Sequence, residues 1–473
     1  MSDLLDRGGI AGHPKGLSTL FFTEMWERFS YYGMRAILIL FMVASPEKGG
    51  LGFATEKAAA IYGLYTGAVY FTSIPGGFIA DRLLGLRRAV LIGGVLIALG
   101  HYSLALNILP LFYAGLVSIV LGTGLLKANI ASIVGQLYGE GDARRDAGFS
   151  IFYMGINTGA FVSPLVCGYL AQKVGWHWGF GAAGVGMTLG LVQFVAGRAR
   201  LGEAGLHFEK AKDAGALWAK IALSLLVLSA VMYQLWNYRD FVVLFGTAGL
   251  FVWIFRQAEN PIERQRTLAV IALFVFATLF WAGFEQAGSS LNLFADQLTR
   301  NSFLGYDFPS SWFQSVQPLF IILLAPAFAW LWIRLGTREP SSPAKFAYGL
   351  LFVGLGFLAM VIAAQLFETD KVLVSPMWLI ACYFLHTLGE LCLSPVGMST
   401  VSKLAPARVL GLMMGVWYLS ISLGNFIGGR VAGQFEKFPL PQLFGAVFLT
   451  TAASALVLAL LVKPIRRLMS GVH

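Results

Sequence analysis

The sequence predicts an all-α polytopic membrane protein, and three observations support this prediction. The 473 residues are 57% hydrophobic and only 12% charged, with a mean hydropathy of +0.71, whereas soluble domains carry about 25% charged residues. The charges are bunched between long apolar runs, and about 20 apolar residues are enough for a helix to cross a bilayer. Lys and Arg are concentrated in alternate connecting segments, which is the pattern of a membrane protein with one cytoplasmic side.

Fourteen apolar segments follow one another along the chain and predict fourteen transmembrane helices. Their predicted bounds are 17–43, 58–80, 88–107, 109–134, 147–172, 177–197, 216–233, 239–256, 267–297, 310–334, 344–366, 375–402, 408–433 and 441–463. They divide as six, two and six, and the near-equal outer groups indicate a duplicated bundle, as in many transporters. The predicted domains are an N-terminal six-helix bundle (1–197), a linker with two extra transmembrane helices (198–266) and a C-terminal six-helix bundle (267–473).

The charge distribution predicts the orientation in the membrane. With the N-terminus inside, Lys and Arg in the inner segments outnumber those in the outer segments by nearly three to one. Both termini are therefore expected in the cytoplasm, and the net charge of +10 needs no nucleic-acid partner. No cleavable signal peptide is expected, because the first apolar segment is long and contains charges. Three cysteines fall inside predicted spans, where we expect them to fill space rather than form disulfides: Cys167, Cys382 and Cys392.

The first predicted span contains a stripe of charged and aromatic residues. Within FFTEMWERFSYYGMRA, spacings of three, four and seven residues place its polar members on one helix face: Glu24, Glu27, Arg28, Tyr31, Tyr32 and Arg35. Each charge inside a membrane costs about 3 kcal/mol by insertion scales, so the stripe is expected to face a wet cavity or partner charges. A static lock between the acidic and basic side chains is the structural alternative, although packed apolar residues would stabilise a bundle at lower cost.

Three more ionisable residues lie inside predicted spans. Lys127 is in GTGLLKANIAS, Glu285 in FWAGFEQAGSS and Glu390 in HTLGELCLSPVG. All charged spans are thus the first or the fourth of a six-helix group, so we predict that these four helices line one central cavity. The two extra helices have no acidic residue in their interior, and we expect them to form a peripheral hairpin.

Other functional classes lack their characteristic residues. The six histidines are isolated in the sequence, so no metal site is predicted. No glycine-rich phosphate loop followed by Lys and Ser or Thr is present, so an ATP-driven pump is not expected. His386 lies one turn before Glu390 and is a candidate proton carrier. Because no second histidine is near it in the sequence, we favour a packed histidine bonded to a backbone carbonyl.

Three motifs resemble the proton-dependent oligopeptide transporters, the POT or PTR2 family of the major facilitator superfamily. SIPGGFIADRLLGLRR (73–88) resembles the superfamily's loop signature between spans two and three. EMWERFSYYG resembles the family's ExxER motif, and FYMGINTGAFVSPL (152–165) resembles its span-five signature. The resemblance covers nearly the whole chain. It implies the major facilitator fold, two six-helix bundles plus an extra two-helix hairpin, and a proton-coupled symporter that imports di- and tripeptides by alternating access, without enzyme activity or cofactor.

The resemblance also implies roles for individual residues. Proton coupling is expected at Glu24, Glu27, Arg28 and Glu285. Peptide contacts are expected from Arg28, Tyr31, Tyr32, Tyr70, Lys127, Asn157, Trp281, Gln317, Glu390 and Trp417. Arg28 and Lys127 would bind the peptide carboxylate, and Glu390 would bind its ammonium group. Two gate salt bridges are expected, Arg35 with Glu285 on the outer side and Lys127 with Glu390 on the cytoplasmic side. The chain departs from the family at Gln317, Phe284 and Ala128, where relatives often have Asn, a polar residue and Pro.

The expected partners are di- and tripeptides, protons and the lipid bilayer, and the expected location is a bacterial inner membrane, with a monomer as the functional unit. Other substrates remain alternatives, since plant relatives move nitrate and other anions and drug exporters share the fold. The opposite charges in the predicted cavity favour a zwitterionic peptide. A membrane enzyme would need a cluster of catalytic groups near one membrane face. A receptor or scaffold would leave the charged stripe unexplained.

Overall fold

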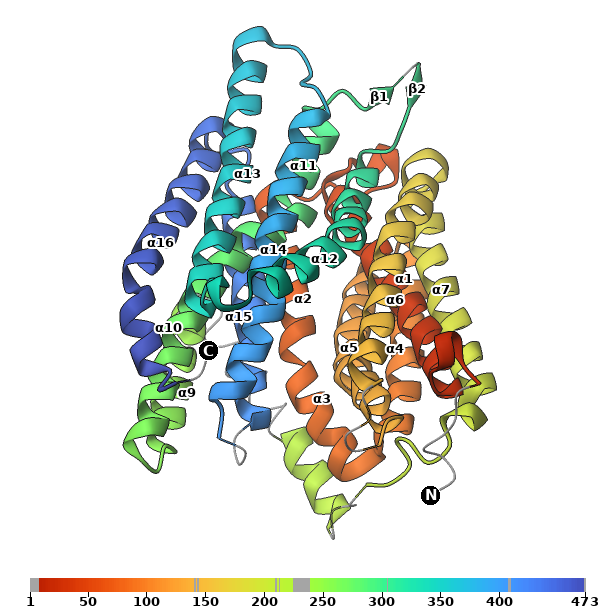
Figure 1. Cartoon of the computed structure of the whole chain (residues 1–473). Helices are drawn as coiled ribbons and strands as arrows, with labels where there is room; N and C mark the ends of the chain where they lie inside the picture. Colours follow the sequence, from red (N-terminus) through yellow and green to blue (C-terminus); the bar gives the residue numbers. More distant parts are fainter. Residues whose placement is uncertain are drawn as a thin grey trace.

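The computed structural model describes residues 8–139, 142, 144–208, 211, 213–223, 239–303, 305–406 and 410–471. Long helices run side by side through the molecule, and α1 begins and α16 ends toward its lower side in Figure 1. The predicted span 216–233 extends into 224–238, which lies outside the described residues, as does the start of the span predicted at 408–433.

The N-terminal half is built from helices that follow the predicted spans closely. They are α1 (Lys15–Val43), α2 (Thr55–Phe71), α3 (Ser73–Ile79), α4 (Leu86–Ala105), α5 (Leu109–Gln136), α6 (Arg145–Tyr169) and α7 (Trp176–Gly197). α1 packs against α6 and α7, and α4 packs against α5 and α7. The span predicted at 58–80 is divided at Thr72, whose hydroxyl donates to the Val120 carbonyl of α5 at 3.0 Å. π-helical turns follow α3 at Ala80–Leu84 and α6 at Leu170–Val174.

The C-terminal half repeats this arrangement with its own set of helices. They are α10 (Pro261–Phe284), α11 (Ser290–Gln297), α12 (Val316–Leu335), α13 (Ser342–Asp370), α14 (Met377–Leu404), α15 (Leu410–Ala432) and α16 (Leu440–Leu468). α13 packs against α14 and α16, and α10 packs against α15. A short antiparallel hairpin, β1 (Ser302–Phe303) with β2 (Tyr306–Asp307), follows α11. α9 (Arg239–Arg256) precedes this half. The division into three domains stays a prediction.

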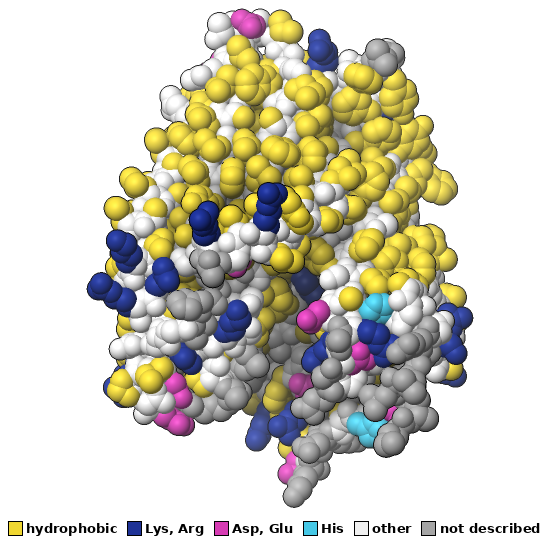
Figure 2. Space-filling model, in the orientation of Figure 1, with side chains coloured by type: hydrophobic (Ala, Val, Ile, Leu, Met, Phe, Trp, Pro, Cys, Tyr) yellow, Lys and Arg dark blue, Asp and Glu magenta, His cyan; other side chains and the backbone are white. Residues whose placement is uncertain are grey.

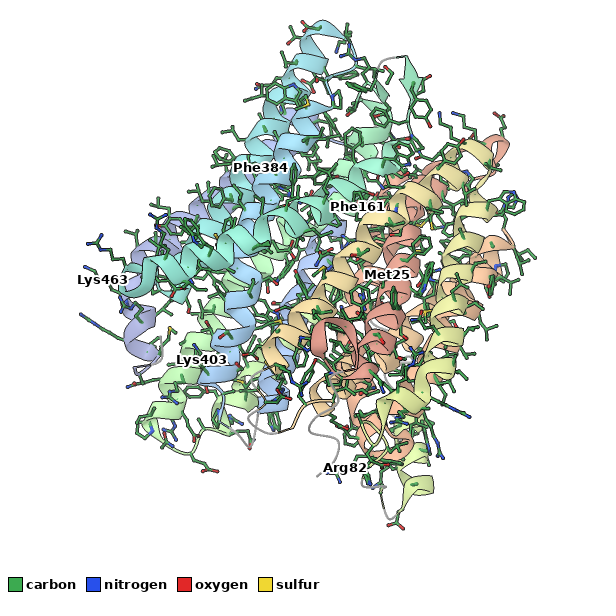
Figure 3. The ribbon with its side chains drawn as sticks, turned by 45° about the vertical axis from the view of Figure 1, so that its right-hand side comes forward. Met25, Arg82, Phe161, Phe384, Lys403 and Lys463 are labelled. Atoms are coloured by element: carbon green, nitrogen blue, oxygen red, sulfur yellow. The ribbon has the colours of Figure 1, made fainter. Side chains whose placement is uncertain are left out.

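Helix length, composition and surface make the chain an integral membrane protein. Nine of the described helices are long and apolar enough to cross a membrane. Hydrophobic side chains cover the upper part of the surface, while Lys, Arg, Asp and Glu gather toward the lower end (Figure 2). Lipid tails favour such an apolar surface, because they offer no hydrogen bonds to polar groups. Arg82 and Lys403, both predicted in cytoplasmic segments, lie toward this lower end (Figure 3).

The two halves meet where α2 packs against α15 and where α6 packs against α12. Glycines make the first contact close, since a Cβ on Gly63 of α2 would lie only 2.8 Å from the Cα atom of Gly429 in α15. Small residues of this kind let helix backbones touch inside a membrane. The seam between α2 and α15 is therefore a backbone contact between the two halves.

The span predicted at 267–297 is interrupted at its charged residue. α10 ends at Phe284, Glu285–Gly288 form a 3₁₀ turn, and α11 begins after Ser289. A Cβ on Gly288 would collide with the Tyr62 hydroxyl and lie 3.0 Å from Arg35 Nε. The interruption thus lets the backbone at Gly288 lie close to Arg35 of α1 and Tyr62 of α2. α10 also begins earlier than predicted, because the Asn260 side chain caps it by accepting from the Glu263 N–H at 2.9 Å.

Candidate functional site

The polar stripe of α1 is buried inside the molecule. Glu24, Glu27 and Arg28 are at most 2% exposed. Arg28 Nε lies 2.8 Å from Glu24 Oε1 and 2.6 Å from Glu27 Oε2. Two carboxylates therefore share one guanidinium. The helical spacing that predicted a common face for Glu24 and Arg28 is confirmed by this contact.

Further along the same face, Arg35 connects α1 to the other half. Its Nη2 lies 2.5 Å from Glu285 Oε2, and its Nε donates to the Tyr62 hydroxyl at 2.7 Å. Arg35 is 7% exposed and Glu285 5%. The predicted partners of the outer salt bridge are thus paired and buried in this conformation.

The predicted salt bridge between Lys127 and Glu390 is not formed, which corrects the expectation for this conformation. Each charge is engaged by other residues. Lys127 Nζ lies 3.6 Å from the centre of the Tyr70 ring and 6.0 Å from that of Tyr418 in the other half. Glu390 Oε2 accepts from Gln317 Nε2 at 3.1 Å. Lys127 and Glu390 are both partly exposed, and Figure 2 shows a recess between the two lower lobes of the molecule. The recess opens toward the lower end of the molecule, and the Arg35–Glu285 contact joins the two halves.

Aromatic residues surround the charges in both halves. The guanidinium carbon of Arg28 lies 5.8 Å from the Tyr31 ring centre, and that of Arg35 lies 5.9 Å from the Tyr32 ring centre. In the C-terminal half, the rings of Trp281 and Trp417 lie edge to face with centroids 6.5 Å apart. Tyr31 and Tyr32 therefore lie against the charged stripe, and Trp281 and Trp417 pack against each other.

Other predicted side chains contact their own helices or pack in the interior. Asn157 is buried, and its amide donates to the Tyr153 carbonyl of α6 at 3.0 Å. His386 packs against the Phe284 and Phe357 rings, and its Nε2 lies 3.5 Å from Cys382 Sγ. This agrees with a packed histidine. Within the described part of the chain, no group of His, Cys, Asp or Glu could hold a metal ion.

Sequence reasoning missed Gln172, which joins the halves on the same side as Arg35. Its Nε2 donates to Asp296 Oδ1 at 3.2 Å and to Ser310 Oγ at 2.8 Å. Its Oε1 accepts from Ser311, from the backbone N at 3.1 Å and from Oγ at 2.7 Å. We call these contacts the Gln172 network. No sequence signal marked it, because a polar residue at the end of a span is common.

Tyr62, the second partner of Arg35, was also missed, although a signal existed. It precedes the predicted site residue Tyr70 by about two helical turns. Residues at that spacing lie on one helix face. Extending the same-face rule from α1 to α2 would have found it.

Two helical halves with buried charges at their junction, open on one side and closed on the other, define a membrane transporter. The POT family model matches residues 87–447, and the chain belongs to the POT family. Family membership confirms the resemblance and places the chain among transporters rather than enzymes.

Individual relatives and a solved structure agree with this assignment. The chain is 43% identical to Peptide transporter YePEPT of Yersinia enterocolitica over 97% of its length and 96% of that protein. It is 37% identical to a Di-/tripeptide transporter of Lactococcus lactis over 98% of both chains. A crystal structure of peptide transporter POT in complex with sulfate matches with a TM-score of 0.92 at 44% identity, covering 99% of this chain and 98% of that one. The predicted fold class is thereby confirmed.

Proposed function

We propose that this protein is a symporter that imports di- and tripeptides together with protons by alternating access. The observation that carries the proposal is the polarity of the site. Arg28 and Lys127 belong to the N-terminal half, and Glu390 belongs to the C-terminal half. A peptide zwitterion has one carboxylate and one ammonium group, so it fits between a cationic and an anionic wall. The names of the curated relatives support peptides as substrates.

The proposed carboxylate site consists of Arg28 and Lys127. Arg28 Nη2 is buried and has no hydrogen-bond partner among the described residues. Leaving a buried donor unpaired costs about 1–3 kcal/mol, so an arriving carboxylate would be stabilised there. Lys127 rests on the Tyr70 ring, and a cation–π contact of this kind positions an ammonium group without neutralising it.

The proposed ammonium site is Glu390. Gln317 holds one of its carboxylate oxygens at 3.1 Å. A charge-assisted hydrogen bond of this type fixes the direction of the carboxylate. Relatives often have Asn where this chain has the longer Gln317. We expect Gln317 to act on the peptide mainly through Glu390.

The charge balance of the stripe provides a route for proton coupling. Glu24, Glu27 and Arg28 together carry a net charge of −1 when all three are ionised. A peptide carboxylate at Arg28 adds a second negative charge, and one proton on Glu24 or Glu27 cancels it. Peptide and proton would then favour each other's binding by the same factor, as linkage requires.

The proposed gates act in alternation. The Arg35–Glu285 pair closes the outer side, and protonation of Glu285 would remove the charge that holds Arg35. As the outer side opens, the halves would approach on the inner side and bring Lys127 to Glu390. Peptide bound at Arg28 and Lys127 would then compete with the Lys127–Glu390 contact. Loss of that contact would open the inner side and release the peptide toward the cytoplasm.

The proposal includes a driving force and a location. The proton gradient drives uptake without a cofactor, and the protein acts as a monomer in a bacterial inner membrane with both termini in the cytoplasm. The common position of Arg82 and Lys403 at the open end supports this orientation (Figure 3).

Uptake of labelled dialanine into liposomes containing the purified protein tests the proposal. With an acidic exterior, we expect accumulation above the external concentration, and we expect a proton ionophore or excess unlabelled tripeptide to abolish it. Empty liposomes serve as the control. Accumulation that survives the ionophore would exclude proton coupling, and uptake of nitrate without dialanine would exclude the peptide assignment.

A further inference from the structure

A cavity of about 590 Å³ lies beside the C-terminal end of α1 and outside the proposed peptide site. The other elements around it are the segment after α1, the π-helical turn Leu170–Val174, the start of α7 and the end of α11. Because α1 begins toward the lower side of the molecule, this cavity lies at the opposite end, which we propose to face the exterior (Figure 1). Its volume falls within the range of about 300–1,000 Å³ that is usual for small-molecule sites. We call this cavity the outer pocket.

Side chains of both charge signs line the outer pocket. Lys48 and Lys173 supply two ammonium groups, and Asp296 supplies a carboxylate. All three residues are exposed, so a ligand can reach them from water. Within the described part of the chain, neither lysine forms an ion pair. The three groups together carry a net charge of +1 when ionised, which favours a ligand carboxylate and disfavours a simple amine.

The segments that carry the two lysines are held in place by hydrogen bonds. The Trp176 indole N–H donates to the Lys48 carbonyl at 2.9 Å, which ties the segment after α1 to α7. Lys173 lies in the π-helical turn, where the Gly175 N–H donates to the Leu170 carbonyl at 2.8 Å. An ordered backbone reduces the entropy that a ligand must remove on binding. Binding would therefore require adjustment mainly of the lysine side chains.

The carboxylate of Asp296 is oriented by neighbours from both halves. Its Oδ1 accepts from Ser310 Oγ at 2.6 Å and from Gln172 Nε2 at 3.2 Å. Hydrogen bonds to a charged acceptor are stronger than those to a neutral one, so these contacts fix the direction of the group. Both bonds end on Oδ1, and Oδ2 could therefore accept from a ligand ammonium group while they persist.

We propose that the outer pocket is a second binding site, for a small zwitterion such as a short peptide or an amino acid. The ligand carboxylate would bind Lys48 and Lys173, and the ligand ammonium group would bind Asp296. A simple anion would match only the lysines and a simple amine only the carboxylate, so a zwitterion uses the lining most fully. These three residues lie outside the proposed peptide site, and the inference on binding is independent of the proposed transport.

The outer pocket spans the two halves of the molecule, which gives the ligand a consequence for conformation. Lys48 and Lys173 belong to the N-terminal half, and Asp296 belongs to α11 of the C-terminal half. A ligand that contacts all three side chains binds best while the halves touch here, so it favours the conformation with the outer side closed. High external concentrations of the zwitterion should therefore slow uptake. This consequence, unlike binding itself, rests on the proposed function.

Lysine acetylation read by mass spectrometry tests binding at the pocket itself. The detergent-purified full chain is acetylated briefly, and the rates at Lys48 and Lys173 are divided by the rate at Lys371, an exposed lysine outside the pocket. This ratio corrects for reagent that the amine of the ligand consumes. The added ligands are dialanine, alanine, N-acetyl-dialanine, which lacks the ammonium group, and sulfate, a simple anion.

Three variants are compared with the wild type in this measurement. Asp296→Asn removes the carboxylate but retains an oxygen that can accept from Ser310 and Gln172. Asp307→Asn, on the exposed hairpin that follows α11, is its matched control. Glu390→Gln weakens the proposed peptide site and leaves the lining of the outer pocket unchanged, so it separates local binding from an effect transmitted from that site.

We expect dialanine to at least halve the acetylation ratios of both pocket lysines in the wild type, in Asp307→Asn and in Glu390→Gln. A larger effect of alanine would identify amino acids as the source of the zwitterion. In Asp296→Asn, the effect of dialanine should fall to that of N-acetyl-dialanine. Unchanged ratios in the wild type, full protection in Asp296→Asn or lost protection in Glu390→Gln would each overturn the proposal. So would sulfate as effective as dialanine, because the pocket would then bind an anion only.

Uptake measures the conformational consequence separately. In the liposome assay, the initial rate of dialanine uptake by the wild type should decline at the highest external concentrations, and Lys48→Gln/Lys173→Gln should abolish this decline. Saturation without a decline in the wild type would overturn the effect on opening. Absence of any uptake would count against the proposed function and not against the binding site, because the acetylation measurement uses no proton gradient.

Discussion

The two ends of the central site, which we propose to be its outer and inner sides, differ in how the two halves are joined. On the outer side, Arg35 pairs with Glu285 across the halves, and Asn292 of α11 donates to the Ala36 carbonyl of α1 at 2.8 Å. At the other end, Lys127 and Glu390 are not paired with each other: Lys127 lies near the rings of Tyr70 and Tyr418, and Glu390 accepts from Gln317. The charges that pair across the halves, Arg35 and Glu285, are therefore different residues from Lys127 and Glu390 in this conformation.

In the proposed function, this difference separates a gate from a binding site. Buried, directional contacts close the outer side, and each would have to be broken for opening. Lys127 and Glu390 are not paired with each other. Lys127 contacts aromatic rings, and Glu390 accepts a hydrogen bond from the Gln317 amide. In the proposed function, Lys127 and Glu390 can therefore bind the two charged ends of a peptide.

The largest expected effect comes from removing the charge of the outer gate. Glu285→Gln removes the ion pair with Arg35 and the proposed site of protonation. We expect gradient-driven accumulation of dialanine to fall at least tenfold, which corresponds to about 1.4 kcal/mol, while exchange of dialanine across the membrane persists. Glu47→Gln, an exposed carboxylate on the same side, is the matched control. Accumulation at the wild-type level in Glu285→Gln would remove this residue from the coupling mechanism.

The next effect tests the tight fit around Arg35. Gly288→Ala places a methyl group against the Tyr62 hydroxyl and 3.0 Å from Arg35 Nε. Overpacking of this kind costs about 1–3 kcal/mol, so we expect a lower melting temperature and a several-fold loss of uptake. Gly181→Ala is the control, because a Cβ there meets nothing within 4 Å. Equal melting temperatures and equal uptake in the two variants would show that the contact around Arg35 accommodates an added methyl group.

A smaller effect is expected from the Gln172 network. Gln172→Ala removes four exposed or partly buried hydrogen bonds to Asp296, Ser310 and Ser311. Water can replace them, so we expect a net loss of only about 1 kcal/mol. Spin labels at Lys173→Cys and Arg300→Cys, one in each half, report the outer separation. We expect a longer distance to become populated in Gln172→Ala and not in the control Gln297→Ala. An unchanged distance distribution would mean that the ion pair alone closes this side.

The smallest effect concerns the inner side. Gln317→Ala removes the hydrogen bond that orients Glu390, at a cost of about 1 kcal/mol. We expect KM for dialanine to rise roughly fivefold, as this free energy implies, with kcat unchanged. A fall in kcat without a change in KM would indicate that Gln317 acts in the conformational change instead.

The sequence predicted best what helical periodicity determines. Glu24 and Arg28 share a face because they are four residues apart, and their contact follows from α1 alone. Their position inside long apolar segments identified Lys127, Glu285 and Glu390 as intramembrane charges. Contacts between residues of different helices were predicted only where the family resemblance implied them.

The remaining features depend on tertiary structure. The interruption of the helix at Glu285–Gly288 places Gly288 against Tyr62 and Arg35, and no local pattern encodes these neighbours. The expected Lys127–Glu390 pair is not formed in this conformation, because helical periodicity does not determine which residues of different helices meet.

The central claim is that opposite charges on the two halves hold the two ends of a peptide, and one comparison tests it most directly. Competition with dialanine uptake gives the affinity for dialanine and for its N-acetylated form, in the wild type and in Glu390→Gln. Acetylation removes the ammonium group, so we expect a loss of at least tenfold in the wild type and almost none in Glu390→Gln. An equal loss in both proteins would contradict the clamp and leave Glu390 with a structural role.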